Sequence, residues 1–270
     1  MVVQGLPVEL RAVARFLVGE KPDSDARRVA GLAEARRGVI ARTSGTARIW
    51  YSPKPDQGFA PRPEPGAPLP IGWDRVARTG KDRMWATALY IMARSFNCRR
   101  GLELGACAGI SAMYLAAIPT MERFVTVEGS AELASVARDS LRSFKRAEVI
   151  VGRFDEALDR FERTGETFDF AFIDGHHEQR ATIHYFERLL PMLAPGALVL
   201  FDDIRWSEDM FAAWRRLRTR ESLSHAIDLG HIGVGIMVGG PRSSGGAPLQ
   251  WDLSFVADDL AISKPWGWTD

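Results

Sequence analysis

The sequence predicts a doubly wound α/β domain built around a mostly parallel sheet. From about residue 100 onward, short apolar runs alternate with segments whose apolar residues recur at helical spacing. Alternation of this kind is typical of βαβ units, in which the helices cover both faces of a parallel sheet. The predicted strands are GLEL (101–104), FVTV (124–127), AEVIV (147–151), FDFAFI (168–173) and ALVLF (197–201). The predicted helices between and after them span 109–118, 130–144, 155–163, 177–193 and 207–219.

Length and composition fit one large domain, or one domain with an elaborated end. The chain has 270 residues, of which 46% are hydrophobic and 26% are charged, and this is enough apolar material for a sizeable core. A net charge of +1 gives no support to nucleic acid or to an anionic membrane as a partner. We therefore expect a partner that is a small molecule.

Cysteine content and the N-terminal sequence predict a cytoplasmic protein. Cys98 and Cys107 are the two cysteines, and they form no CxxC pattern, which fits a reducing compartment. No apolar run approaches the roughly 20 residues that span a bilayer. The first residues lack a basic segment followed by an apolar one, so a secretory signal is not expected.

Residues 1–75 are predicted to form a helical cap followed by a proline-rich arm. Apolar residues recur at helical spacing over 8–18 and again over 24–42, where Ser24 is the expected N-cap. The segment 51–72 holds seven of the 15 prolines and cannot be a helix or an inner strand. It is interpreted as a linker or, alternatively, as a lid or subunit contact, which leaves a homo-oligomer open.

The main domain is assigned to residues 76–240. It opens with a helix that starts at Thr79 or Gly80, and it ends with two strands, 223–229 and 233–239, joined by a glycine-rich turn. Two strands joined this closely predict an antiparallel hairpin at one edge, giving a sheet of seven strands. Residues 241–270 form a C-terminal extension that holds a candidate extra strand, QWDLSFVA, and a tail with Trp266 and Trp268.

A glycine-containing turn follows the first predicted strand. Its sequence, ELGACAGIS, places Glu103, Gly105, Gly109 and Ser111 where the strand passes into a helix, and glycines there let a ligand approach the backbone closely. The spacing differs from the GxGxxG of nicotinamide dehydrogenases, so that class is not expected. Glu128 ends the second strand, 23 residues after Gly105, where a carboxylate can accept hydrogen bonds from ribose hydroxyls. Phe154 and Asp155 follow the third strand, where an adenine would lie.

Three acids and two histidines follow the fourth and fifth predicted strands. Asp174 ends the fourth strand, His176 and His177 come directly after it, and Asp202 and Asp203 end the fifth strand. Because carboxyl ends of neighbouring parallel strands face one crevice, these side chains should converge there. Such a group indicates chemistry rather than packing.

These motifs resemble those of class I S-adenosylmethionine-dependent methyltransferases over residues 78–240. Within that class the sequence is similar to metal-dependent O-methyltransferases of the catechol and caffeoyl-CoA type and to bacterial relatives with an Asp-Gly-x-His motif. The resemblance implies a Rossmann-like fold and S-adenosylmethionine as cofactor. It places Glu103 and Gly105 along the methionine part of the cofactor and Ser111 at its carboxylate. The remaining residues implied to lie around the cofactor are Gly109, Glu128, Phe154, Asp155 and Asp174.

The same resemblance implies a divalent cation held by Asp174, Asp202 and Asp203. The first two are 28 residues apart, as in the catechol-type enzymes, whereas Asp203 stands where those enzymes have Asn. Oxygen ligands suit Mg²⁺, and the extra carboxylate could admit Mn²⁺ instead. His177 occupies the position of the family's catalytic lysine, which makes it the candidate general base beside Asp174, with His176 a weaker candidate.

The predicted function is therefore methyl transfer to a hydroxyl of a small molecule such as a sugar, phenol or natural product. Two alternatives stay open. One is a methyltransferase for nitrogen or sulfur that needs no metal, with the acids only orienting groups. The other is a non-catalytic protein that binds the cofactor and acts in an assembly. Substrate specificity in this class lies in loops and extensions, here residues 1–75 and the C-terminal segment, which match no motif.

Overall fold

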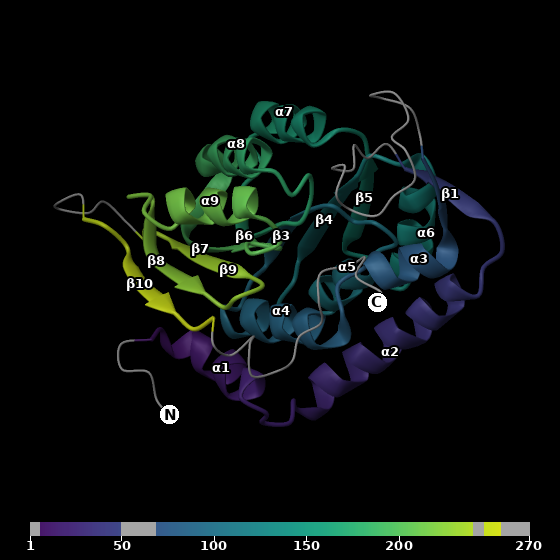
Figure 1. Cartoon of the computed structure of the whole chain (residues 1–270), viewed down its shortest axis with the longest axis horizontal. Coiled ribbons are helices and arrows are strands. Elements are labelled where there is room, and N and C mark those ends of the chain that lie inside the picture. Colours follow the sequence, from purple (N-terminus) through teal and green to yellow (C-terminus); the bar gives the residue numbers. More distant parts are fainter. Residues whose placement is uncertain (1–5, 50–68, 240–245, 255–270) are drawn as a thin grey trace.

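The structure is a computed structural model that describes residues 6–49, 69–239 and 246–254. Within these ranges, one sheet has eight strands in the order β10-β8-β9-β7-β6-β3-β4-β5 (Figure 1). Its strands are β3 (Arg100–Leu104), β4 (Arg123–Glu128), β5 (Ala147–Val151), β6 (Phe168–Ile173), β7 (Leu193–Phe201), β8 (Leu223–Asp228), β9 (Gly233–Met237) and β10 (Leu249–Asp252).

The pairing confirms a mostly parallel α/β sheet with an antiparallel hairpin. Strands β5, β4, β3, β6 and β7 pair in parallel, and β9 runs antiparallel to both β7 and β8. The described sheet has eight strands rather than seven, because β10 adds to β8 in parallel at the edge. This strand is the candidate one in QWDLSFVA. Its four residues are largely exposed, so its sequence carries little of the apolar pattern that marks inner strands.

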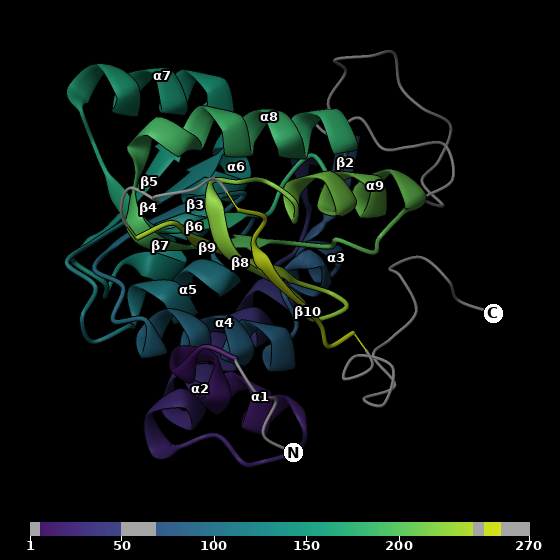
Figure 2. The ribbon, with the colours of Figure 1, turned by 90° about the vertical axis from the view of Figure 1, so that its left-hand side faces the viewer.

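Helices cover both faces of the sheet, as Figures 1 and 2 show. Helices α7 (Phe154–Thr164), α8 (Gln179–Leu189) and α9 (Glu208–Leu217) lie on one face. The other face carries α4 (Arg83–Ser95) and α5 (Ile110–Ala116). Helix α6 (Ala131–Leu141) packs against α5 on the same face. Beyond them, α1 (Arg11–Leu17) and α2 (Ser24–Ala41) form an outer layer against α4 and α5. The shorter elements are η1 (Val8–Leu10), α3 (Trp73–Thr79) and η2 (Leu190–Met192).

Capping side chains set where several helices begin. Helix α4 begins at Arg83 rather than at Thr79 or Gly80, because the carboxylate of Asp82 accepts the N–H of Trp85 at 2.9 Å. Helix α2 is capped by Asp23 and not by the expected Ser24, which becomes its first residue. Ser207 caps α9, because its hydroxyl accepts the N–H of Met210 at 3.2 Å.

The apolar core lies in two layers, one on each face of the sheet. Strand β6 contributes to both, because Phe170 and Phe172 pack toward α4 and α5 whereas Ala171 and Ile173 pack toward α7, α8 and α9. All four are almost fully buried, which explains why this strand reads as a continuous apolar run. Burying each phenylalanine contributes roughly 2–3 kcal/mol.

The N-terminal cap is helical as predicted and includes a small sheet that the sequence did not indicate. Strands β1 (Thr46–Ile49) and β2 (Leu69–Gly72) pair antiparallel beside α6. Most of the proline-rich arm lies outside the described residues, as do Trp266 and Trp268. Of the two thiols, Cys98 is buried and Cys107 is partly buried, and both are free. None of the described helices combines the length and apolar character needed to cross a bilayer.

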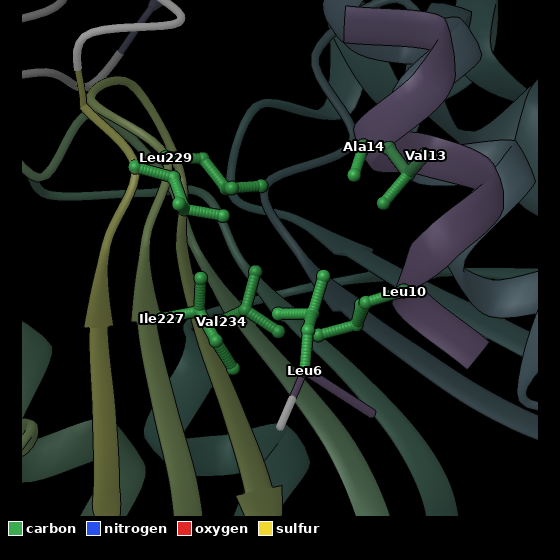
Figure 3. Close-up of a pocket in the computed structure, with 8 residues that line it drawn as sticks. Leu6, Leu10, Val13, Ala14, Ile227, Leu229 and Val234 are labelled. Carbon is green, nitrogen blue, oxygen red and sulfur yellow. The ribbon is translucent and has the colours of Figure 1, made fainter. Parts of the chain in front are cut away.

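An apolar pocket lies between the N-terminal cap and the edge hairpin (Figure 3). Leu6, Leu10 and Val13 line it from one side, and Ile227 and Val234 line it from β8 and β9. Its lining offers no charged side chain or hydroxyl that could orient a ligand. We interpret it as a packing seam that fixes the cap to the sheet.

Candidate active site

The carboxyl ends of β6 and β7 carry the acids predicted from the sequence. Backbone pairing continues one residue past each strand, since the N–H of Asp174 donates to Leu104 O at 2.9 Å and that of Asp202 donates to Ile173 O at 3.0 Å. Both acids are therefore fixed by the sheet itself rather than by a loop. Asp202 is 3% exposed, and Asp203 follows it at the turn out of the strand.

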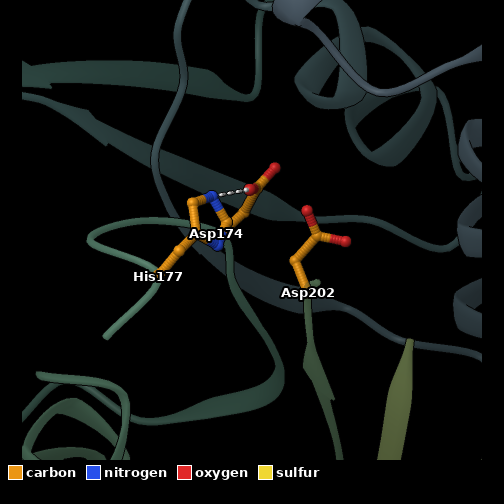
Figure 4. Close-up of side chains that lie close together, drawn as sticks. All are labelled: Asp174, His177 and Asp202. Atoms are coloured by element: carbon orange, nitrogen blue, oxygen red, sulfur yellow. Dashed lines mark ion pairs between the residues drawn. The ribbon is translucent and has the colours of Figure 1, made fainter. Parts of the chain in front are cut away.

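His177 lies between two of these acids. Its Nε2 is 3.7 Å from Asp174 Oδ1 and 3.7 Å from Asp203 Oδ2, and Figure 4 shows the imidazole beside Asp174 with Asp202 facing them. Ligand atoms of Asp174, His177 and Asp202 lie within 4.8 Å of one another, close enough to share one ion. The structure thus brings together the predicted acids and the candidate base.

Two further residues complete the cluster, and sequence reasoning missed both. Lys81 precedes α4, and its Nζ donates to Asp202 Oδ2 and to Nε2 of His231 at 3.0 Å. His231 lies in the turn between β8 and β9, with its ring 5.2 Å from that of Trp85. Nε2 of His231 is also 3.1 Å from Asp203 Oδ1. One signal in the sequence could have suggested such a lysine. Asp203 stands where the catechol-type enzymes have Asn, and the additional negative charge calls for a cation nearby.

The outer helix α2 holds the loop that carries Lys81. The guanidinium of Arg37 donates to the carbonyl of Ala77 at 2.6 Å, to that of Gly80 at 3.0 Å and to that of Lys81. Arg37 thereby satisfies carbonyls at the end of α3 and in the loop before α4. The position of the ammonium consequently depends on the N-terminal cap.

Burial and crowding perturb the acids of the cluster in opposite directions. Burial, together with the neighbouring Asp202, raises the pKa of Asp174 well above its usual value. Burial also opposes ionisation of Asp202, but the Lys81 ammonium and the other groups around this carboxylate together outweigh burial and lower its pKa to about 2. Burial lowers the pKa of His231, and Lys81 lowers it further, so this imidazole is neutral and accepts from the ammonium.

Backbone strain is concentrated at this crevice. Five non-glycine residues of the described ranges have positive φ, and the four other than Asn97 follow β3, β6 or β7 at this edge: Cys107, His176, His177 and Asp203. Each such conformation costs on the order of 1–3 kcal/mol and persists only where the surroundings impose it. The strain supports a functional rather than a purely structural turn.

The glycine turn after β3 fits against the acid-bearing edge. Gly105 has φ +115°, and a Cβ there would come within 1.8 Å of Asp174 O, so no larger residue is accommodated. Gly109 has φ +82° and opens α5, where its Cα lies close to α6. Ser111 is buried in the first turn of α5. The predicted cofactor loop thus adjoins the acid cluster through a backbone contact.

Glu128 and Glu103 differ in how their carboxylate oxygens are hydrogen-bonded. Glu128 accepts N–H groups of Cys107 and Ser130, both at 2.8 Å, and these bonds fix the loop after β3 to the end of β4. Glu103 is fully buried, and Thr126 donates to its Oε2 at 2.6 Å, whereas Oε1 has no partner. Burial raises the pKa of Glu103 to about 7. An unpaired buried carboxylate oxygen beside a ligand loop is placed to accept from a cationic or N–H group of a ligand.

The two residues after β5 that were predicted to lie near an adenine, Phe154 and Asp155, have different surroundings. Phe154 packs against His176 and Tyr185, and a Cβ on Gly175 would come within 2.6 Å of its ring, so Phe154 borders the loop after β6. Asp155 instead pairs with His184 at 2.7 Å and with Arg188 at 3.2 Å on α8. The structure brings Phe154 to the crevice and leaves Asp155 bound elsewhere. The cofactor roles of both remain predictions.

Replacing Glu103 with Gln should make the metal-free, cofactor-free protein more stable at alkaline pH. The carboxyl has a pKa of about 7 when folded against 4.5 as its ordinary value. Its favourable contribution is therefore complete below pH 4.5 and is lost as pH rises through 7. Between pH 4.5 and 8 the variant should gain roughly 3 kcal/mol over the wild type in urea unfolding. The exposed Glu221→Gln variant should follow the wild type, and equal pH profiles for Glu103→Gln and wild type would contradict the assignment.

Comparison with known proteins identifies the central segment. The family model of a methyltransferase domain matches residues 102–204, which run from β3 through the acids after β7. These residues, called the methyltransferase segment from here on, are similar to a methyltransferase domain. The methyltransferase segment contains Glu103, the glycine turn, Glu128, Asp174, Asp202 and Asp203, and the resemblance inferred from these motifs is confirmed.

Two curated relatives share this segment. Catechol O-methyltransferase domain-containing protein 1 of Mus musculus is 32% identical over 142 residues, covering 50% of this chain and 53% of the relative. Catechol O-methyltransferase of Mycobacterium tuberculosis is 32% identical over 120 residues, covering 43% and 53%. The chain therefore spans about half the length of the curated relatives it matches.

Solved structures support the fold over a longer stretch. An O-methyltransferase from Bacillus cereus, solved in complex with SAH, aligns with a TM-score of 0.52 and 20% identity, covering 83% of this chain and 95% of its own. At this identity the likeness concerns the fold. It extends the Rossmann-like architecture well beyond the methyltransferase segment.

Proposed function

We propose that this protein is an S-adenosylmethionine-dependent O-methyltransferase that acts on a small hydroxylated molecule with the help of a divalent cation. The observation that carries the proposal is the convergence of Asp174, Asp202, Asp203 and His177 at the edge where the glycine turn contacts Asp174. The methyltransferase segment supports the cofactor, and the names of both curated relatives make a catechol the first substrate to test.

The residues present fit a divalent cation such as Mg²⁺ or Mn²⁺. Asp174 and Asp202 offer carboxylate oxygens, which these ions prefer, and Asp202 Oδ1 is buried with no hydrogen-bond partner. Three carboxylates against the one Lys81 ammonium leave two negative charges when Asp174 is ionised, which is the charge one divalent cation neutralises. Burial and the neighbouring Asp202 raise the pKa of Asp174, and a cation held between the two carboxylates would favour their ionised forms.

The chain's own groups supply positioning and proton transfer. A bound cation would lower the pKa of a substrate hydroxyl at this edge. His177 Nε2 accepts the hydroxyl proton, and the carboxylates of Asp174 and Asp203 on either side stabilise the imidazolium that results. The turn of Gly105 and Glu128 holds the methyl donor, so that oxygen and methyl meet in one crevice.

Removing the metal should abolish turnover. Protein treated with EDTA and passed through a desalting column should methylate a catechol at least about a thousandfold more slowly, because metal-ion catalysis supplies several kcal/mol. Adding Mg²⁺ or Mn²⁺ should restore the rate, as followed by SAH release. Full activity after EDTA treatment would contradict the metal-assisted mechanism but would not contradict the proposed cofactor.

A second candidate is methyl transfer to nitrogen or sulfur without metal. The contact of Lys81 with Asp202 favours it, since an ammonium already lies against the acids. The EDTA experiment separates the two when amine and thiol acceptors are tested beside the catechol. Absence of methyl transfer to any acceptor, together with tight SAH binding, would instead favour a non-catalytic cofactor-binding protein.

A further inference from the structure

Lys81 lies against one half of the acid cluster and not the other. In the described part of the chain, two groups of side chains could hold an ion, and they share Asp202. One consists of Asp174, His177 and Asp202, and the other of Asp202, Asp203 and His231. The Lys81 ammonium contacts every member of the second group. It donates to Asp202 Oδ2 and to His231 Nε2 at 3.0 Å, and Asp203 Oδ1 is 3.7 Å away.

The other half retains an unsatisfied acceptor. Asp202 Oδ1, on the same carboxylate that Lys81 binds through Oδ2, is buried and has no partner. A ligand atom of Asp174 lies within 4.8 Å of one of Asp202, close enough for both to contact one ion. The side chain of Lys81 is 7% exposed, so water does not screen its charge from these groups.

We infer that Lys81 is a built-in counter-cation that fills the Asp202, Asp203 and His231 half of the cluster and directs a single divalent cation to Asp174 and Asp202 Oδ1. This inference rests on the proposed metal-assisted function and deepens it. Lys81 acts through the acids and is a positioning residue. It also accounts for Asp203: the ammonium offsets its charge, so the cluster keeps the net charge that two carboxylates and an amide would have.

If Lys81 compensates charge, its removal should tighten metal binding, because a buried positive charge near the ion repels it. A lysine with only a structural role would not have this effect. Mn²⁺ binding to the full chain, followed by electron paramagnetic resonance, should show one ion per wild-type protein. Lys81→Met should lower the Mn²⁺ dissociation constant by on the order of tenfold or more. The exposed Lys145→Met variant, which removes the same charge far from the cluster, should leave it unchanged.

A double variant keeps the test decisive if Lys81→Met folds poorly. Asp203→Asn alone should raise the Mn²⁺ dissociation constant on the order of tenfold, because the Lys81 charge then has no matching carboxylate and repels the ion. Adding Lys81→Met to Asp203→Asn should return it to within about threefold of wild type. Unchanged or weaker Mn²⁺ binding on loss of Lys81 in both backgrounds, or two ions in the wild type, would overturn the role of Lys81. No Mn²⁺ binding by the wild type would instead remove the metal from the proposed function.

Discussion

Replacing Asp174 with Asn should lower methyl transfer by at least about a thousandfold without lowering stability. The loss follows from removing a carboxylate that the proposed cation requires, since metal-ion catalysis supplies several kcal/mol. Stability should be retained because burial and Asp202 already favour the neutral form of this carboxyl, and an amide has nearly the same shape. Turnover, Mn²⁺ binding and thermal unfolding should be measured on one preparation, with SAH binding measured separately to reveal any loss through the cofactor.

Asp159→Asn provides the matched control for this prediction. Asp159 is an exposed acid on α7 that pairs with Arg188, so the same change of charge occurs away from the crevice. Its activity should stay within about twofold of wild type, as is usual for surface substitutions. An Asp174→Asn variant with more than a tenth of wild-type activity would show that the acid is not a required ligand.

His177→Asn should lower kcat by a factor of roughly 10²–10⁴ while Mn²⁺ binding stays within about threefold of wild type. The reason is that the imidazole accepts a proton in the proposed mechanism and is not needed to hold the ion. The variant should also lose the rise of kcat with pH that a general base imposes. The measurement is kcat from pH 5 to 9 with saturating Mg²⁺.

Two comparison variants sharpen the His177 test. His184→Asn removes an imidazole that pairs with Asp155 on the outer surface, and it should leave kcat unchanged within about twofold. His176→Asn breaks the 2.6 Å contact with Tyr185 and should cost less than tenfold. Equal losses of Mn²⁺ affinity and kcat in His177→Asn would identify His177 as a metal ligand, and a larger loss in His176→Asn would move the base to that residue.

The main features of the sheet could be predicted because periodicity reports burial directly. Strands such as β6 are covered on both faces and read as unbroken apolar runs, so their order and class follow from alternation with helices. Strand β10 and the β1–β2 pair escaped because short, exposed strands have no such pattern. The predicted cap of α2 and the predicted start of α4 are off by one to a few residues, because several neighbouring side chains could cap each helix.

The candidate site was half predictable for a related reason. Acids that end neighbouring strands must share an edge, so Asp174, Asp202 and Asp203 could be grouped from the sequence. Lys81 and His231 belong to a loop before a helix and to a hairpin turn, and the bonds of Lys81 to Asp202 and to His231 join residues 121 and 150 positions apart. No local pattern encodes contacts of that range. Asp155 was grouped with the site from its position after β5. That position gives no sign that His184 of α8 binds it on the outer surface.

Because Arg37 holds the Lys81 loop, the part of the chain that shapes the acid cluster is larger than the segment that the family model matches. Residues 102–204 carry the family's motifs, yet isolated from the rest they would hold three crowded carboxylates and no ammonium to balance them. The balancing charge is delivered by a loop that is anchored in turn by an arginine of the outermost helix layer. Transplanting the motif-bearing segment onto another scaffold would transfer its chemistry only if this distant pair of basic residues travelled with it.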